Sequence, residues 1–337
     1  MTKLVIDGDY IKYMIAAAGE KRSVDVVHTP SGKIKNFPNR TSFYGHWKKK
    51  EGGWLAETNL NRMQEGKPPF DISEFEFKDK QIAEPLHFVL ASVKNHINNV
   101  VDALGAKDYQ IYIGKGDSWR VEASTILKYK GSRAALLKPI HLEEVEKYLI
   151  TTHGAKIVRH KECDDQCVID CTEDRSKVLV GVEKDFMGCE INYYIHGQME
   201  KPLAIKGFGE LYLNKKKDVK GYGYVWWLHQ VMSGDSSDEY FANSACPENK
   251  WGDMSSFKLL EGCTNEKDAW QAVISGYNKL YPEPKEIVGW RGDKIIVDAK
   301  YVLTENCIMA KMMTSEDYEF NLDEELDKFG LKMESKL

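Results

Sequence analysis

The chain has 337 residues, a composition typical of globular proteins and a formal net charge of −5, which favours one large domain with a smaller appendage. Its seven cysteines include no Cys-x-x-Cys pair, which argues against a disulfide framework and a zinc site. Cys163, Cys167 and Cys171 recur every four residues, as on a helix face that packs small apolar thiols. No apolar stretch is long enough for a signal peptide or a membrane span, so we expect a cytoplasmic protein that does not bind membranes.

The first 80 residues combine a buried strand with a segment of different character. Residues 3–9 read as a short buried strand that ends in two carboxylates and a glycine, and residues 10–18 read as a helix that stops at Gly19. From about residue 23 to 80 the chain is polar, opens with a predicted β-hairpin over 24–37, and resembles an insertion. An acid at the end of a first parallel strand is a candidate metal ligand, and an ordinary strand-end turn explains it equally well when it is seen alone.

Two core elements and a basic stretch follow the insertion. Apolar residues three and four apart over 86–104 predict an amphipathic helix, and residues 109–113 alternate as in a strand. From Lys115 to Lys161 the chain has ten Lys and Arg against five Asp and Glu, although it is acidic as a whole. Spaced cations with aromatic residues are typical of a grip on phosphates and single strands, and a solvated basic loop is the competing interpretation. The residues of this predicted grip are Arg120, Lys128, Tyr129, Lys130 and Arg133.

A cluster of carboxylates lies where a third strand is expected to run into a helix. A predicted helix over 141–150 leads to a strand-like run over 155–158, and Glu162, Asp164 and Asp165 follow. Open α/β folds place their ligands at the carboxyl ends of the strands. Three anions so close call for a positive charge between them, such as one or two Mg²⁺ or Mn²⁺ ions. A solvated helix start is the more common meaning of an acidic cluster taken alone.

The remaining pattern predicts the fold class and the domains. Strands that alternate with helices indicate an α/β fold with a mostly parallel central sheet flanked by helices, and a fourth strand is expected over 177–182. Two more acid pairs follow predicted core elements: Glu183 with Asp185, and Asp235 with Asp238, which would share a face of a helical turn. The tail reads as helices over 255–260, 266–280 and 316–331. We expect an α/β catalytic domain over 1–235, with the insertion at about 23–80, and a smaller helical region over 236–337.

The order of these motifs resembles a known family. The motifs are Ile6-Asp7-Gly8-Asp9, Trp119-Arg120, Tyr129-Lys130-Gly131-Ser132-Arg133, Glu162-Cys163-Asp164-Asp165, Glu183-Lys184-Asp185-Phe186 and Gly234-Asp235-Ser236-Ser237-Asp238. Together they resemble the 5′-nuclease (flap endonuclease, PIN-like) superfamily, with the closest likeness to the 5′-to-3′ exonucleases of tailed phages. The motifs span residues 3–238 in the family's order, and neither the insertion nor most of the tail is covered.

The resemblance implies a metal-dependent 5′-to-3′ exodeoxyribonuclease that uses two Mg²⁺ or Mn²⁺ ions. It assigns metal ligation to Asp7, Glu162, Asp164, Asp165, Glu183, Asp185, Asp235 and Asp238. It implies a basic arch, at about 115–138, that admits a free 5′ end. It also implies that Arg120, Lys130 and Arg133 are the cations that act on the scissile phosphate. The implied substrates are DNA with a free 5′ end, 5′ flaps and the RNA of RNA–DNA hybrids, in phage replication or recombination in the host cytoplasm. A monomer is favoured.

Three features depart from the family's pattern. The family has an aspartate just after the second strand, where this chain has Ile113-Gly114, and Asp117 is an offset substitute. Glu183 stands where the family usually has an Asp, so the side chain at the second metal is longer. The glycine-rich helix-turn-helix signature that grips duplex DNA is missing after Asp238, which leaves the mode of duplex binding open.

Two other functions remain open on the sequence. Asp7-Gly8-Asp9 and the motif at 234–238 also look like the first and last motifs of haloacid-dehalogenase-type phosphatases, whose first Asp is a nucleophile. Tyr10 stands where that family has Thr or Val, and the phosphatase leaves the clusters at 162–165 and 129–133 unexplained. The third possibility is a PIN-like nucleic-acid-binding module without activity, which the missing aspartate after the second strand alone supports.

Overall fold

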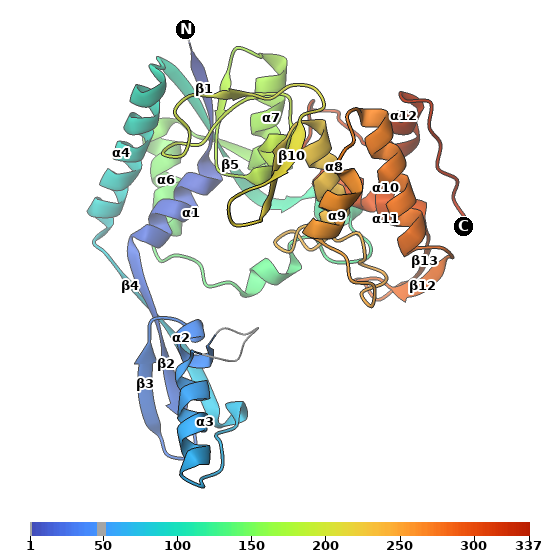
Figure 1. Cartoon of the computed structure of the whole chain (residues 1–337). Helices are drawn as coiled ribbons and strands as arrows, with labels where there is room; N and C mark the ends of the chain where they lie inside the picture. Colours follow the sequence, from blue (N-terminus) through green and yellow to red (C-terminus); the bar gives the residue numbers. More distant parts are fainter. Residues whose placement is uncertain (1, 46–51) are drawn as a thin grey trace. The chain divides into compact units, whose positions relative to one another are not determined.

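The structure, a computed structural model, describes residues 2–45 and 52–337 (Figure 1). These residues divide into two units, which we call the main unit and the small unit. The main unit comprises the residues up to Ile11, Asn95–Leu137 and Glu146–Leu337. The small unit comprises Lys12–Lys94 and Lys138–Val145. The predicted C-terminal region, 236–337, therefore belongs to the same unit as the sheet that carries the acids.

The main unit is built on a six-stranded sheet in the order β6-β5-β1-β7-β8-β9. Its strands are β1 (Lys3–Asp7), β5 (Asp108–Ser118), β6 (Lys156–His160), β7 (Val178–Val180), β8 (Asn192–Tyr194) and β9 (Leu203–Ala204). The first five are parallel, and β9 is antiparallel to β8. Leu4, Val5 and Ile6 of the central strand are fully buried, as expected for a parallel strand covered on both faces. The predicted α/β fold with a mostly parallel sheet is confirmed.

Helices follow the strands at the positions that the sequence predicts. The predicted helices over 10–18, 86–104 and 141–150 correspond to α1 (Gly8–Ala18), α4 (Leu86–Leu104) and α6 (Leu142–His153). The helix after the acidic cluster is α7 (Cys163–Glu173), which packs on β1, β5 and β7. Cys163, Cys167 and Cys171 are free, buried thiols in the core beneath the sheet, which confirms the predicted packing face. None of the helices in the described residues combines the length and apolar character needed to span a bilayer.

The predicted insertion forms the small unit's own sheet. The hairpin expected over 24–37 is present as β2 (Glu20–His28) and β3 (Lys33–Phe37). A third strand, β4 (Phe75–Ala83), which was not predicted, pairs antiparallel with the whole of β2. The helices α2 (Arg40–Tyr44) and α3 (Trp54–Gln64) complete the unit with the short turn η1 (Ile72–Glu74). Val24, Phe37, Phe43 and Phe75 are buried together, so the insertion has a core of its own.

The part of the chain after β9 combines helices with two short hairpins. It contains the hairpin β10 (Glu210–Leu213) and β11 (Val219–Tyr222), then α8 (Tyr224–Ser233), α9 (Asp253–Leu260), α10 (Glu266–Leu280) and α11 (Ala299–Ala310). Its core gathers around Trp227, Trp270 and Tyr277. The hairpin β12 (Lys285–Val288) and β13 (Lys294–Val297) and the helix α11 were not predicted. The predicted helix over 316–331 is wrong: only α12 (Leu322–Asp327) is helical, because the Asn321 side chain accepts from the Asp323 and Glu324 N–H groups and begins the helix there.

Candidate active site

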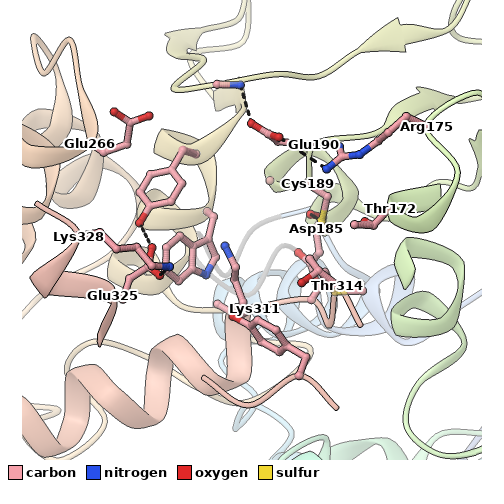
Figure 2. A pocket seen from close by; sticks show the side chains of 17 residues that line it. Thr172, Arg175, Asp185, Cys189, Glu190, Glu266, Lys311, Thr314, Glu325 and Lys328 are labelled. Atoms are coloured by element: carbon pink, nitrogen blue, oxygen red, sulfur yellow. Dashed lines mark hydrogen bonds and ion pairs between the residues drawn. The ribbon is translucent and has the colours of Figure 1, made fainter. Parts of the chain in front are cut away.

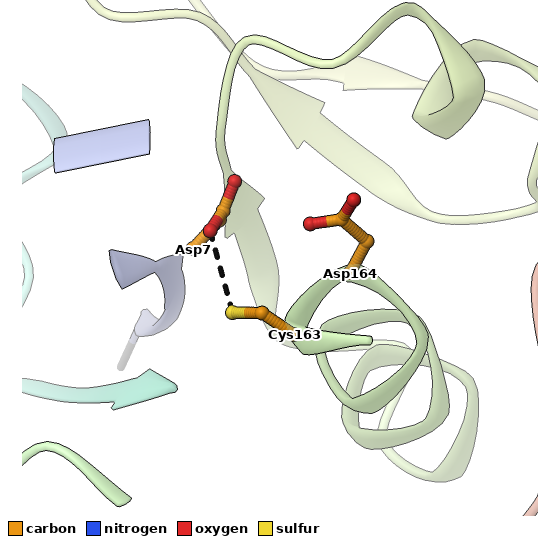
Figure 3. Close-up of side chains that lie close together, drawn as sticks. All are labelled: Asp7, Cys163 and Asp164. Carbon is orange, nitrogen blue, oxygen red and sulfur yellow. Dashed lines mark hydrogen bonds between the residues drawn. The ribbon is translucent and has the colours of Figure 1, made fainter. Parts of the chain in front are cut away.

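Two carboxylates, one buried and one half-buried, meet at the carboxyl edge of the sheet. Asp7 ends β1 and Asp164 lies in the first turn of α7, and Figure 3 shows their side chains beside the Cys163 thiol. One ligand atom from each of these three residues lies within 4.8 Å of the other two. A Cβ on Gly8 would lie 2.4 Å from Tyr112 O, so glycine is what allows the chain to turn from β1 straight into α1 beside β5 and hold Asp7 at this edge.

The charges of this pair oppose each other. Asp7 is 1% exposed, and burial and the neighbouring Asp9 raise its pKa to about 7. Burial and the charge of Asp7 raise the pKa of Asp164 well above its usual value. Burial also raises the pKa of the Cys163 thiol, which donates to Asp7 Oδ1 at 3.3 Å and to Tyr112 O at 3.0 Å. Because a hard divalent cation prefers oxygen ligands, the two carboxylates fit Mg²⁺ or Mn²⁺ and the protonated thiol supports them.

Asp9 lies beside the place where the family has an aspartate. Its carboxylate accepts from the Gly114 N–H at 3.2 and 3.3 Å. A Cβ on Gly114 would come 2.9 Å from Asp9 Oδ2, so the absence of a side chain at this position leaves room for the Asp9 carboxylate. The predicted substitute, Asp117, is exposed on β5. The spacing of Asp7 and Asp9 was the signal in the sequence, and the predicted ligand set did not include Asp9.

Glu162 is held by three donors from the basic segment. It is the N-cap residue of α7 and accepts from Arg120 at 3.2 Å, from the Tyr129 hydroxyl at 2.8 Å and from Lys130 Nζ. Burial works to raise the pKa of Glu162, but the charges of Lys130 and Arg120 outweigh it and the pKa is lowered. The segment predicted as an arch, 115–138, holds these donors on the short helix α5 (Trp119–Ala123) and on the loop before the 3₁₀ turn η2 (Gly131–Ala135).

Asp165 and Arg120 form a buried ion pair. Asp165 is 0% exposed and Arg120 is 1% exposed, and the guanidinium donates to both carboxylate oxygens at 2.6 and 2.8 Å. Asp165 also accepts from the Met313 N–H at 3.0 Å. As placed, Asp165 is neutralised by Arg120 and does not join Asp7 and Asp164. The predicted role of Arg120 on a substrate phosphate does not fit its burial.

Two further predicted acids, Asp235 and Asp238, lie on the loop between α8 and α9. Asp238 accepts from the Tyr129 hydroxyl at 3.1 Å and from Arg133 at 2.8 Å, and Asp235 pairs with Lys184 at 2.8 Å. Asp235 and Asp238 lie on a turn closed by pairing with Tyr240, and not on the predicted helical turn. Tyr129 is 3% exposed and its hydroxyl positions carboxylates, so its ring, as placed, is not open to a nucleic acid.

Glu183 and Asp185 lie at the start of the 3₁₀ turn η3 (Lys184–Gly188). Glu183 precedes it and is exposed, whereas Asp185 lies within it and accepts from the Gln230 side chain. Burial, with the charges of Asp238 and Asp235, raises the pKa of Asp185 to about 7. Partial removal of the Glu183 carboxylate from water and the charges of the same two aspartates also raise its pKa. Mutual repulsion therefore extends from Asp7 and Asp164 to these acids.

Comparison with known proteins gives structural similarity without a sequence match. No protein-family model matches the chain, and no curated protein matches it by sequence. Similar solved structures include a bacteriophage T5 protein co-crystallised with metal ions and the T5 flap endonuclease in a pseudo-enzyme-product complex with DNA and metal ions. Both have a TM-score of 0.44 and 12% identity, over 93% of this chain and 90% of theirs. A T5 5′-exonuclease mutant has a TM-score of 0.38 and 12% identity, over 67% of this chain and 82% of that one.

These structures are of the enzyme class that the sequence motifs resemble. The similarity is remote, so the function proposed below rests on the side chains of this chain.

The raised pKa of Asp7 predicts a pH-dependent stability that is measurable without metal ions. Asp7→Asn is expected to raise the free energy of unfolding in EDTA, because the amide keeps its oxygen as an acceptor and removes a buried charge. The folded-state pKa is about 7 against a usual value of 3.8, so the wild type loses stability relative to the variant as pH rises through this range. Above this pH range the difference in the free energy of unfolding between the variant and the wild type is constant, at about a few kcal/mol.

Thermal unfolding of both proteins in EDTA at several pH values checks this expectation. The advantage of the variant should be larger at about pH 8 than at about pH 5. An advantage of equal size at both would contradict the raised pKa of Asp7.

Proposed function

We propose that the chain is a metal-dependent nuclease that hydrolyses DNA from a free 5′ end in the 5′-to-3′ direction. The observation that carries the proposal is the pair of buried Asp7 and half-buried Asp164 at the carboxyl edge of a parallel sheet, where the charge of Lys130 from the basic segment acts on Asp164. Burial raises the pKa of both carboxylates and the charge of Asp7 raises that of Asp164 further, so the pair is suited to a divalent cation. A basic segment beside them is suited to the phosphates of a polyanion.

Mg²⁺ or Mn²⁺ fits the oxygen donors of this site. Asp7 and Asp164 would hold the first ion, with Glu162 beside them. A second ion would be held by the acids around η3 and the loop before α9, which are Glu183, Asp185, Asp235 and Asp238. When bound, such ions supply an activated water and offset the charge that develops on the scissile phosphate. Asp165 is left out of this set because Arg120 engages both of its oxygens.

Lys130 and Arg133 are the cations that we assign to the phosphate. Lys130 contacts Glu162 and lies 3.7 Å from Asp238, so its ammonium is between two of the acids. Arg133 donates to Asp238 through one nitrogen and to Ser237 O through Nε, and its side chain is 49% exposed. The guanidinium therefore keeps N–H groups for a bidentate contact with a phosphate. Both residues would hold the scissile phosphate against the repulsion of the acids.

The proposed substrate is DNA with a free 5′ end, with 5′ flaps and the RNA of RNA–DNA hybrids as further substrates of the same chemistry. All of them present the same phosphodiester to the acids and to the two cations. A monomer, acting in the cytoplasm of a phage-infected host, is the proposed form.

A time course on 5′-labelled and, separately, 3′-labelled duplex DNA tests the proposal, with Mg²⁺ and with EDTA. Early release of short 5′-labelled products that is lost in EDTA is the expected result. Early release from the 3′ label instead would contradict the direction. Hydrolysis of a small phosphomonoester without cleavage of DNA would favour the phosphatase, and DNA binding without any hydrolysis would favour the inactive module.

Lys130 is expected to act on turnover more than on binding. Lys130→Ala should lower kcat for DNA cleavage by about 100-fold or more and change KM much less, because the ammonium offsets charge that develops in the transition state. Steady-state kinetics check this, with Lys128→Ala as the matched control from the same segment. Lys128 is exposed, with its ammonium 5.4 Å from the Trp290 ring centroid, so its loss should change KM and leave kcat unchanged. An unchanged kcat in Lys130→Ala would exclude the assigned role.

A further inference from the structure

A cavity of about 350 Å³ lies in the main unit beside the acid site (Figure 2). Its wall comes from the end of α7, from η3 and the residues after it, from α8, and from the chain around α11 and α12. Asp185, one of the proposed metal ligands, is part of this wall. Cavities of about 300 Å³ or more accommodate small ligands, so the size alone permits one.

Two donors on this wall, the half-buried Lys311 ammonium and the buried Trp227 N–H, have no acceptor among the described residues. The Lys311 ammonium lies 3.8 Å from the centroid of the Trp227 ring, and no carboxylate or carbonyl of the described residues accepts from it. Trp227 is 2% exposed, and its indole N–H is buried without a hydrogen-bond partner in the described part of the chain. Burial lowers the pKa of Lys311, and the charge of Glu325 opposes this shift without cancelling it. A buried donor without an acceptor costs about 1–3 kcal/mol, which a ligand's oxygen atoms would recover.

Three of the acids that line the cavity have partners other than Lys311, and one of them, Asp185, accepts from the Gln230 side chain. Glu325 accepts from the Tyr224 hydroxyl and from Lys328 at 2.6 Å, and Glu190 faces Arg175 at 3.8 Å; both ion pairs are drawn in Figure 2. Figure 2 also shows Glu266 on the wall apart from the lysine. The inner part of the cavity thus presents donors that the protein itself does not satisfy.

We propose that this cavity binds a small molecule that carries a phosphate group, with Lys311 and Trp227 as its donors. The Thr172 and Thr314 hydroxyls line the same cavity and can donate to further oxygens of the anion. Tyr224, Trp227 and Tyr318 add aromatic surface, which suits the base of a nucleoside monophosphate. Inorganic phosphate and a nucleoside monophosphate share the group that the donors recognise.

The cavity is tied to the acid site through the backbone. Lys311 O accepts from Arg120 at 2.6 Å, and the next residue but one, Met313, donates its N–H to Asp165 at 3.0 Å. A ligand bound to the Lys311 side chain would therefore contact a residue whose backbone carbonyl accepts from Arg120 of the Arg120–Asp165 pair. Binding at the cavity does not depend on the nuclease reaction and can be measured when no metal ion is present.

Calorimetric titration of the full chain in EDTA tests the proposal, with inorganic phosphate in one arm and 2′-deoxyadenosine 5′-monophosphate in the other. Lys311→Met keeps the stem of the side chain and removes the charge, and it should weaken binding about tenfold or more. Trp227→Phe keeps a ring, removes the N–H, and should also weaken binding; it tests the same cavity if Lys311→Met fails to fold. Lys279→Met, an exposed lysine of α10, is the matched control and should bind as the wild type does.

Each outcome has one meaning. Equal affinity for the two ligands would indicate a site for the anion alone, and tighter binding of the monophosphate would add recognition of the nucleoside; both support the proposal. Absence of saturable binding of either ligand would overturn it. Unchanged binding in both Lys311→Met and Trp227→Phe would overturn it as well, and so would loss of binding in Lys130→Met alone, which would place the anion at the acid site.

Discussion

Asp164→Asn is expected to lower the rate of Mg²⁺-dependent DNA cleavage by about 1000-fold or more. Such a factor corresponds to about 4 kcal/mol of transition-state stabilisation, and several kcal/mol is what a bound metal ion supplies at a phosphoryl oxygen. The amide keeps the shape of the side chain and removes the charge that the ion would meet. Because burial and Asp7 raise the pKa of Asp164, the variant should be folded and at least as stable as the wild type in EDTA.

Single-turnover cleavage of 5′-labelled DNA measures the effect, with thermal unfolding as the check on the fold. Asp102→Asn is the matched control, because Asp102 is an exposed acid on α4. This variant should cleave DNA as fast as the wild type does. A rate for Asp164→Asn within tenfold of the wild-type rate would remove this carboxylate from the site.

Asp165→Ala is expected to destabilise the fold by about 3–5 kcal/mol, which is the usual cost of leaving one partner of a buried ion pair alone. Arg120 is 1% exposed. In the variant its guanidinium would keep its charge and lose the carboxylate that accepts from both of its terminal nitrogens. The motif alone suggests the opposite result, that Asp165→Ala abolishes cleavage and spares the fold. The structure favours destabilisation, since Asp165 also accepts from the Met313 N–H.

Chemical unfolding in EDTA measures this loss, and a double variant serves as its control. Arg120→Met with Asp165→Leu replaces the pair by apolar side chains of similar size and should recover most of the lost stability. Asp164→Ala, one residue away, should not destabilise the protein in EDTA. Equal stability of Asp165→Ala and the wild type would show that Arg120 does not depend on this carboxylate.

The sheet and the place of the acids could be predicted because they depend on short-range patterns. An apolar run that ends in an acid predicts a buried strand with a carboxylate at its edge, and Asp7 and Asp164 meet there as expected. The side chains of successive helix residues point about 100° apart, so the Asp164 and Asp165 carboxylates have different neighbours. The partner of Asp165 is Arg120, 45 residues earlier, and no local pattern reveals a contact over that distance.

Other differences have the same physical origin. Tyr129 lies in a basic stretch that suggests contact with bases, yet its ring is buried and its hydroxyl reaches Glu162 and Asp238. The Asp9 carboxylate takes the space beside Gly114, which became evident only from the pairing of β1 with β5. In the tail, an acidic amphipathic pattern over 316–331 suggested a long helix, whereas the Asn321 cap limits it to α12. Tertiary contacts and caps decide these cases, and periodicity does not encode them.

The central claim is that the carboxylates at the edge of the sheet hold the ions that hydrolyse a phosphodiester. Anomalous diffraction from crystals soaked in Mn²⁺ tests it most directly, because the signal locates the ion without relying on activity. The account predicts a peak between the carboxylates of Asp7 and Asp164, which is absent from crystals of Asp164→Asn. A map without a peak at these two residues, at a Mn²⁺ concentration that supports cleavage, would contradict it.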